Sequence, residues 1–265
     1  MKTIFFYKIH ERAFANIEIL ILKILTISVL LGRAWQHLFW DVPFRALMWD
    51  ESLMTPVVKM FGMSWQDYIM NLEIAYQQEF VMQVIGVFYL ILIVFIFFVN
   101  AARKWIKPFL WLSSFFLFAL SLLYWKENFY RIGQLIEYTI QWTIPIFLIF
   151  AIYKTQNTTQ FRFWLKIAIA LTFIGHGLYA FGYYPVPGKF VQMILDMLAL
   201  NDGQATMLLK VMGVLDFVVA IGLFLPFFWK ISIWYCVLWG FATAFARIVT
   251  NFDAMMPMES ASMAL

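Results

Sequence analysis

Long runs of apolar residues, separated by short polar segments, fill the chain from residue 17 onward. A helix needs about 20 such residues to cross the hydrocarbon core of a bilayer. Runs of this length predict transmembrane helices at about residues 17–38, 81–101, 107–125, 136–153, 163–182, 207–228 and 231–249. The pattern therefore predicts an all-α membrane protein with about seven transmembrane helices.

The composition agrees with a lipid environment. Hydrophobic residues make up 64% of the chain and charged residues 13%, whereas about 25% of the residues of a soluble domain are charged. Aromatic residues reach 20%, which is typical of lipid-facing helices with Trp and Tyr near the headgroups. Basic residues lie in short loops between the apolar runs, so nucleic acid is not an expected partner.

The distribution of charge predicts an orientation. The loop 39–80 is rich in carboxylates and has only Arg45 and Lys59 as basic residues. Basic residues gather instead in the N-terminal segment 1–16 and in the alternate loops. By the positive-inside rule, the N-terminus lies inside and the C-terminus outside, as we expect in a bacterial cytoplasmic membrane. The N-terminal segment lacks a small-residue cleavage signal, so we expect it to be retained.

Two parts of the chain are similar to each other. Residues 22–33 (Leu-Lys-Ile leading to Leu-Gly-Arg) match residues 165–176 (Leu-Lys-Ile leading to Ile-Gly-His), and VIGV at 84–87 matches VMGV at 211–214. The matched blocks occur in the same order, which indicates parallel repeats. The predicted units are a first repeat of four helices at 17–154, a second repeat of three helices at 155–250 that lacks its last helix, and an outer tail at 251–265.

Three blocks of the second repeat carry a family resemblance. They are IGHGLYAFGYYPVPGKF, VMGVLDFVVAIGLFLP and GFATAFARIV. These blocks resemble the DoxX/DoxD-like superfamily of integral membrane proteins, most strongly over 163–250 and more faintly over 17–153. The resemblance implies four-helix units and a role as an accessory or quinone-associated subunit of a membrane oxidoreductase, with quinone as the implied cofactor. The chain departs from the family in being a fused pair and in lacking the eighth helix.

Ionisable residues inside the second repeat are candidate site residues, because a charge is costly in the hydrocarbon region. They are His176, Asp216 and Arg247, and all three are expected near the outer side. We expect Asp216 to pair with Arg247, and His176 could join them. Both a polar clamp that fixes helix register and a proton- or ligand-binding site fit this pattern.

The first repeat has a denser charged cluster at the outer end of its first helix. Arg33 and His37 lie four residues apart on one helical face, and they are followed by Asp41, Arg45, Asp50 and Glu51. If a pseudo-twofold axis relates the repeats, Arg33 corresponds to His176, and the two outer segments meet at an outward-facing vestibule. The alternative is an interfacial loop anchored by tryptophans, with its charges solvated or paired.

Several other chemistries lack support in the sequence. The last span has no lysine for a retinal Schiff base, and haem is not favoured because its candidate ligands, His37 and His176, both lie toward the outer boundary. Copper is not favoured either, because methionines are common in this chain; the tail contains Met255, Met256, Met258 and Met263. Hydrolase, metalloprotease and nucleotide-binding motifs are missing from the sequence.

The leading expectation is therefore a non-catalytic, DoxX-like membrane subunit that associates with a redox or quinone complex. The alternative is a small-molecule or ion transporter with an outward-facing polar site. A third possibility is a membrane enzyme that uses His176 or His37 as a base. Because the eighth helix is missing, we expect the open flank of the second repeat to contact a protein partner or a second copy of the chain.

Overall fold

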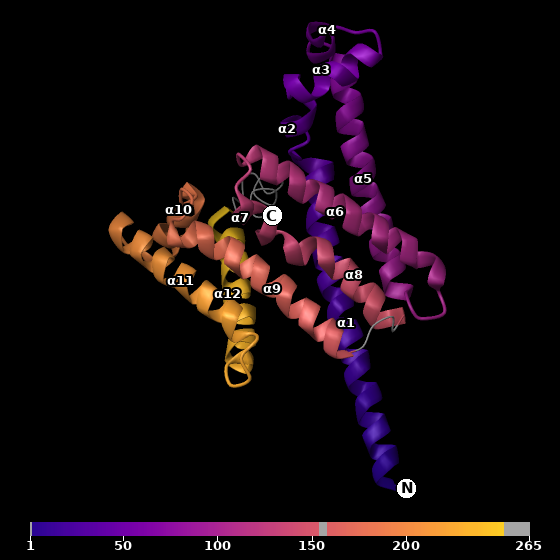
Figure 1. Cartoon of the computed structure of the whole chain (residues 1–265), viewed down its shortest axis with the longest axis vertical. Helices are drawn as coiled ribbons and strands as arrows, with labels where there is room; N and C mark the ends of the chain where they lie inside the picture. Colours follow the sequence, from indigo (N-terminus) through magenta and orange to yellow (C-terminus); the bar gives the residue numbers. More distant parts are fainter. Residues whose placement is uncertain (1, 154–157, 252–265) are drawn as a thin grey trace.

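The computed structural model describes residues 2–153 and 158–251, which form helices and connecting segments with no strand among them (Figure 1). In chain order the elements are α1 (Lys2–Phe39), α2 (Arg45–Met48), α3 (Glu51–Met60), α4 (Trp65–Ile69), α5 (Leu72–Phe98), η1 (Lys104–Ile106), α6 (Lys107–Glu127), α7 (Ile132–Glu137), α8 (Thr139–Tyr153), α9 (Thr158–Phe181), α10 (Gly188–Leu198), α11 (Asp202–Gly222) and α12 (Trp229–Asn251). Lys154 and the tail from residue 252 onward, with the four methionines considered for Cu(I), lie outside the described residues.

Five helical stretches are long and apolar enough to cross a membrane, and each overlaps one of the predicted spans. They are Leu72–Phe98, Lys104–Glu127, Ile132–Tyr153, Thr159–Phe181 and Asp202–Gly222. The predicted spans at 17–38 and 231–249 lie within α1 and α12, which are not among these five. The chain is an all-α membrane protein.

A first group of helices surrounds the main apolar core. Helix α1 packs along α5, and α8 packs against both α1 and α6. Leu30, Tyr89 and Leu148 are fully buried where these helices meet. Helix α1 is continuous from Lys2 to Phe39, so residues 2–16 and the expected first span form one helix.

The segment expected as a long loop at 39–80 is largely helical. It forms α2, α3 and α4, which lie beyond the ends of α1 and α5 (Figure 1). Three helix starts in this segment are capped by side chains: Asp50 accepts a hydrogen bond from the Leu53 amide at α3, Ser64 and Asp67 form a capping box at α4, and Asn71 caps α5. These caps satisfy amide groups that have no partner within a helix, and they explain why a polar segment folds into short helices.

A second group consists of α9 to α12, and its closest contact is between α9 and α11. A Cβ added at Gly213 would lie 2.5 Å from the Phe181 amide nitrogen, and one at Gly177 would lie 3.0 Å from the Gly213 carbonyl oxygen. Only glycine allows backbones to approach this closely. Helix α12 packs against α11 and α10.

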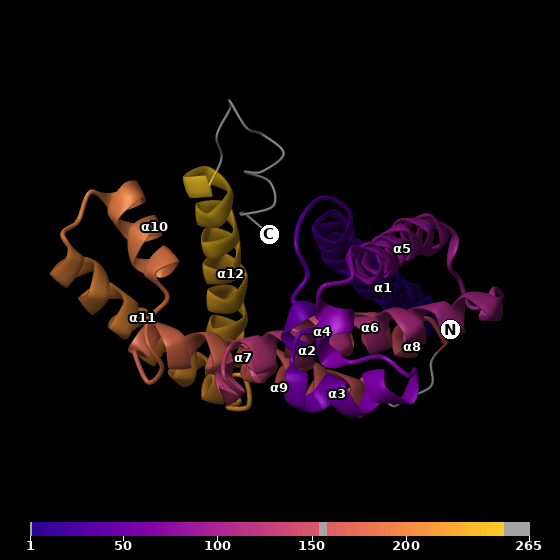
Figure 2. The ribbon, with the colours of Figure 1, turned by 90° about the horizontal axis from the view of Figure 1, so that it is seen from above.

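Helices α7 and α8 join the two groups. Figure 2 shows α10 to α12 at one end, α1 and α5 at the other, and α7 and α9 between them. Helix α7 crosses α9 at a glycine, because a Cβ at Gly175 would lie 2.5 Å from the Glu137 amide nitrogen. The Ile140 amide donates to Thr172 Oγ1 at 3.1 Å. These contacts fix residues 128–141 between the two helix groups, and a cavity lies beside this segment.

Candidate functional site

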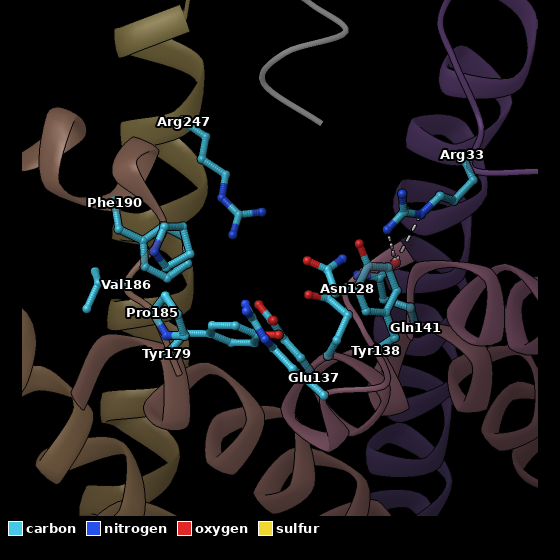
Figure 3. Close-up of a pocket in the computed structure, with 13 residues that line it drawn as sticks. Arg33, Asn128, Glu137, Tyr138, Gln141, Tyr179, Pro185, Val186, Phe190 and Arg247 are labelled. Carbon is cyan, nitrogen blue, oxygen red and sulfur yellow. Dashed lines mark hydrogen bonds between the residues drawn. The ribbon is translucent and has the colours of Figure 1, made fainter. Parts of the chain in front are cut away.

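A cavity of about 420 Å³ lies between the two helix groups (Figure 3). The first group and α7 contribute Arg33, Asn128, Arg131, Gln134, Glu137, Tyr138 and Gln141 to its wall. The second group contributes Tyr179, Pro185, Val186, Pro187, Phe190 and Arg247. Figure 3 shows Arg33 and Arg247 reaching in from opposite sides, with Asn128 and Glu137 between them.

Positive charge is in excess in this cavity. Arg33, Arg131 and Arg247 bring three cations and Glu137 brings one carboxylate, which gives a formal charge of 3 − 1 = +2 for the lining. Arginine is always protonated, and its planar guanidinium matches a carboxylate or phosphate group. A cleft lined by one sign of charge concentrates ions of the opposite sign. The wall is therefore suited to an anion.

Arg33 is the most deeply buried of these cations, with 7% of its surface exposed. Its Nε and Nη2 donate to Gln141 Oε1 at 3.1 and 2.6 Å, and its Nη1 donates to Gln36 Oε1 at 2.5 Å. The guanidinium carbon lies 5.1 Å from the centre of the Tyr138 ring and 5.8 Å from that of Tyr124. Within the part of the chain that the structure describes, no carboxylate forms an ion pair with Arg33.

A second layer holds the Arg33 partners in place. The Gln36 amide donates to the Tyr124 hydroxyl and, at 3.1 Å, to the Asp41 carbonyl oxygen. The Tyr124 and Tyr138 rings stack with their centres 5.0 Å apart. The buried cation is thus oriented by amides and aromatic rings, and its charge is not neutralised by them.

Next to the cavity, His176 and Asp216 form a buried pair between α9 and α11. His176 Nδ1 lies 2.8 Å from Asp216 Oδ2, and the Tyr235 hydroxyl of α12 donates to Asp216 Oδ1 at 2.9 Å. Asp216 is fully buried. The His176 ring packs on Phe190, with ring centres 5.4 Å apart, and Phe190 is part of the cavity wall.

The expected pairing of Asp216 with Arg247 needs correction. Both carboxylate oxygens of Asp216 receive hydrogen bonds from His176 and Tyr235, whereas the Arg247 side chain extends into the cavity (Figure 3). The physical reason is the close crossing of α9 and α11 at Gly177 and Gly213, since it brings the imidazole within reach of the carboxylate one turn further along α11.

His37 lies apart from the cavity and joins α1 to α5. Its Nδ1 is 3.1 Å from the Met82 carbonyl oxygen, and its ring meets the Tyr89 ring edge-on, with centres 5.5 Å apart. It is buried, with 5% of its surface exposed. These contacts give His37 a packing role between the two helices.

Three of the remaining predicted residues, Asp41, Arg45 and Asp50, form ion pairs within the outer segment and between it and the neighbouring helices. Arg45 pairs with Asp41 at 2.5 Å and with Glu79 at 2.8 Å. Asp50 pairs with Lys126 of α6 at 2.5 Å, and the hydrogen bond from Lys126 holds the pKa of Asp50 well below its usual range.

The residues that line the cavity agree only in part with the expected outward-facing vestibule. Arg33 and the second outer segment, residues 185–187, do share one cavity. Asp41, Arg45, Asp50 and Glu51 of the first outer segment are not among its lining residues; Glu51 lies exposed in the first turn of α3. The segment 128–141 occupies the place that the hypothesis gave to them.

Sequence reasoning missed that segment, which supplies about half of the wall. Gln134, Glu137, Tyr138 and Gln141 recur at spacings of three and four residues, the pattern of one helical face. The pattern was available in the sequence, but it lies at the start of an apolar run, where the polar positions read as a connection between spans.

Comparison with protein-family models, with curated proteins and with solved structures finds no match for this chain. The function is therefore argued from the cavity and its charges alone.

Proposed function

We propose that this protein binds a small organic anion in the cavity between its helix groups, as a solute transporter with an outward-facing polar site. The observation that carries the proposal is Arg33, a buried guanidinium that faces the cavity and is held by amides and rings. Burying an ionisable side chain in a membrane protein is unfavourable, and in other membrane proteins such side chains mark ligand or ion pathways.

A carboxylate in the cavity would neutralise a charge that the protein leaves uncompensated. Three of the five N–H groups of the Arg33 guanidinium donate to Gln141 and Gln36, which leaves two that can donate to a carboxylate. Arg131 sits over the rings of Tyr184 and Phe129, with distances of 5.9 Å to each ring centre, so its position is also constrained. A preorganised cation loses little freedom when an anion binds, and this favours affinity.

The rest of the wall favours an organic anion over a bare inorganic one. Tyr138, Tyr179 and Phe190 present rings to the cavity, and Pro185 and Pro187 present apolar edges. Its volume of about 420 Å³ lies within the range of small-molecule sites, and these rings and prolines add apolar surface to a lining that is mainly polar. An aromatic carboxylate matches both features.

The proposal includes seven transmembrane helices in two parallel repeats, and one pair of contacts supports the repeats. When the two repeats are aligned so that Arg33 matches His176, Leu38 corresponds to Phe181. The second matched block aligns Gly86 with Gly213. A Cβ at Gly86 would lie 2.8 Å from Leu38 Cγ, and one at Gly213 would lie 2.5 Å from the Phe181 amide nitrogen. Equivalent glycines thus contact equivalent positions. In this scheme the cavity faces outward and the N-terminus lies inside.

A quinone-associated subunit, as the DoxX-like resemblance implies, is the competing reading of the same cavity. A quinone is neutral and offers carbonyl oxygens, so it would use the rings and hydrogen-bond donors but would gain little from an excess of positive charge. The probes chosen below separate the two readings.

The apolar flank of α11 and α12 is where the proposal places any protein partner. Ile221, Trp234 and Phe241 are exposed there, and in a bilayer lipid covers such residues. Whether a second copy of the chain lies on this flank is tested by the mass of the protein in nanodiscs.

The test compares benzoate with its neutral analogue benzamide by isothermal titration calorimetry, on protein in phosphatidylcholine nanodiscs. We expect benzoate to bind and benzamide to bind at least tenfold more weakly. Hydrogen bonds to charged groups contribute about 1.5–3 kcal/mol, so Arg33→Gln should weaken benzoate binding by about 10- to 100-fold. Arg45→Gln is the matched control, because Arg45 is ion-paired outside the cavity.

Further arms identify the ligand class. Arg247→Gln tests a second cavity cation and keeps the test valid if Arg33→Gln does not fold. Phosphatidylglycerol in the nanodisc reveals whether a lipid headgroup competes for the site. Decylubiquinone is the quinone probe. Equal affinity for benzoate and benzamide, or tight quinone binding that Arg33→Gln leaves unchanged, would overturn the anion proposal. Uptake of radiolabelled benzoate into proteoliposomes tests transport itself.

A further inference from the structure

We propose that His176 and Asp216 together form a proton-binding site whose protonation is coupled to the binding of an anion in the neighbouring cavity. The inference rests on the proposed function, since the cavity must bind an anion for the coupling to be seen. It adds that each anion binds together with a proton, and it assigns that proton to a site outside the cavity wall.

The geometry of the pair provides a place for one proton. His176 Nδ1 and Asp216 Oδ2 are 2.8 Å apart, a normal charge-assisted hydrogen-bond distance. The second carboxylate oxygen is occupied by the Tyr235 hydroxyl at 2.9 Å. The Asp216 side chain is wholly buried, whereas 17% of the His176 side chain remains exposed. The imidazole is therefore the member of the pair that exchanges a proton with its surroundings.

The charge of the pair depends on that proton. With a neutral imidazole, Asp216 is a buried carboxylate with a net charge of −1 and only neutral hydrogen-bond partners. With a protonated imidazole the pair is neutral overall, because the imidazolium and the carboxylate compensate each other. A buried charge without compensation is unfavourable, so the pair favours proton uptake, and histidine exchanges protons in the physiological range.

Among the residues that the structure describes, the charged groups that act on His176 come from the packed elements α7, α11 and α12, and they are Glu137, Asp216 and Arg247 respectively. The Tyr235 hydroxyl of α12 acts on the partner carboxylate, Asp216. Glu137 and Arg247 also line the cavity. Phe190 of α10 connects the His176–Asp216 pair to the cavity, because its ring packs on the His176 ring and also belongs to the cavity wall.

The sign of the coupling follows from the charges. Proton uptake removes a negative charge from the pair next to the cavity, which makes the cavity more attractive to an anion. By thermodynamic reciprocity, a bound anion makes proton uptake by His176 more favourable. Anion affinity should therefore rise as the pH falls, and one proton should enter with each anion. In a transporter this arrangement would link anion movement to the proton gradient.

The first experiment measures proton uptake on benzoate binding, by calorimetry near pH 7 in buffers of different ionisation enthalpy. Benzoate stays ionised above about pH 6, as carboxylic acids do, so it does not contribute. For the wild type we expect net uptake and a Kd that rises about 5- to 10-fold from pH 6 to pH 8, at the low end of usual coupling. In Asp216→Asn and in His176→Asn both effects should disappear. Benzoate binding without proton uptake would overturn this inference and leave the proposed function standing.

The second experiment follows the protonation of His176 directly by NMR. The chain has three histidines, so ¹⁵N-histidine labelling gives three pairs of ring-nitrogen signals, and the His176 pair is the one that is absent in His176→Asn. Followed over the pH range in which histidines titrate, this pair of signals should shift in the wild type, and its midpoint should move upward when benzoate is added. If benzoate does not bind, the proposed function fails, and an unchanged His176 signal over this pH range then refutes the proton site separately.

Discussion

The crossing of α9 and α11 can be tested with one added methyl group. In Gly213→Ala the new Cβ would lie 2.5 Å from the Phe181 amide nitrogen and 2.9 Å from its Cα. Both atoms belong to the backbone of α9, so no side-chain rotation relieves the clash. The two helices must move apart, and the variant should be less stable than the wild type.

The magnitude follows from two opposing terms. Overpacking a well-packed contact costs roughly 1–3 kcal/mol, and the upper end applies because backbone atoms must shift. Replacing glycine by alanine inside a helix contributes about 1 kcal/mol in the opposite direction. The expected net loss is about 2 kcal/mol for Gly213→Ala.

Two other glycines provide matched controls. A Cβ at Gly86 would meet Leu38 Cγ at 2.8 Å, which a rotation of the Leu38 side chain can relieve, and His37 Cβ at 3.0 Å, which it cannot. The loss for Gly86→Ala should therefore be smaller than for Gly213→Ala but not zero. A Cβ at Gly240 of α12 has no atom within 4 Å, so Gly240→Ala should stabilise the protein by up to about 1 kcal/mol.

The assay is denaturant unfolding of the three variants in mixed micelles, read by tryptophan fluorescence. The expected order of stability is Gly240→Ala, then Gly86→Ala, then Gly213→Ala. Because Asp216 lies one turn from Gly213, Gly213→Ala should also reduce the proton uptake that accompanies benzoate binding. A Gly213→Ala variant as stable as Gly240→Ala would refute the close crossing and with it the basis for the His176 and Asp216 pairing.

Two further predictions concern hydrogen bonds seen in the structure. Lys126→Met removes the ion pair that lowers the pKa of Asp50, so it should lower the melting temperature at pH 7. A carboxylate with a lowered pKa stabilises the fold above its unfolded-state pKa, so the difference in melting temperature from the wild type should shrink as the pH falls below about 4. A constant difference between pH 7 and pH 3 would contradict the assignment. Tyr235→Phe removes one hydrogen-bond donor from the buried Asp216 and should lower the free energy of unfolding by about 1–3 kcal/mol. Tyr183→Phe on the exposed surface is the control and should lower it little. Equal losses would contradict the role of the Tyr235 hydroxyl.

The membrane character of the chain could be predicted from the sequence because burial in lipid depends on properties that add up along a segment. Five of the predicted spans coincide with helices that are long and apolar enough to cross a membrane. The same reasoning selected Arg33, His176, Asp216 and Arg247 as candidate residues, because a charge within an apolar run stands out whatever the fold.

The partners of those residues could not be predicted, because they depend on how the helices rotate and cross. Asp216 pairs with His176 and Tyr235, and Arg247 reaches the cavity instead. Residues 128–141 include the predicted connection before the span at 136–153 and the first residues of that span, and they supply much of the cavity wall.

Local composition and periodicity are enough to establish that the chain is helical and lies in a membrane. The pairing of its charges depends on how the helices pack against one another. At Gly175, Gly177 and Gly213 the backbones of α7, α9 and α11 approach each other closely, and these contacts set the distances between the three helices. A difference of a few ångströms there determines whether an arginine neutralises Asp216 or faces an open cavity.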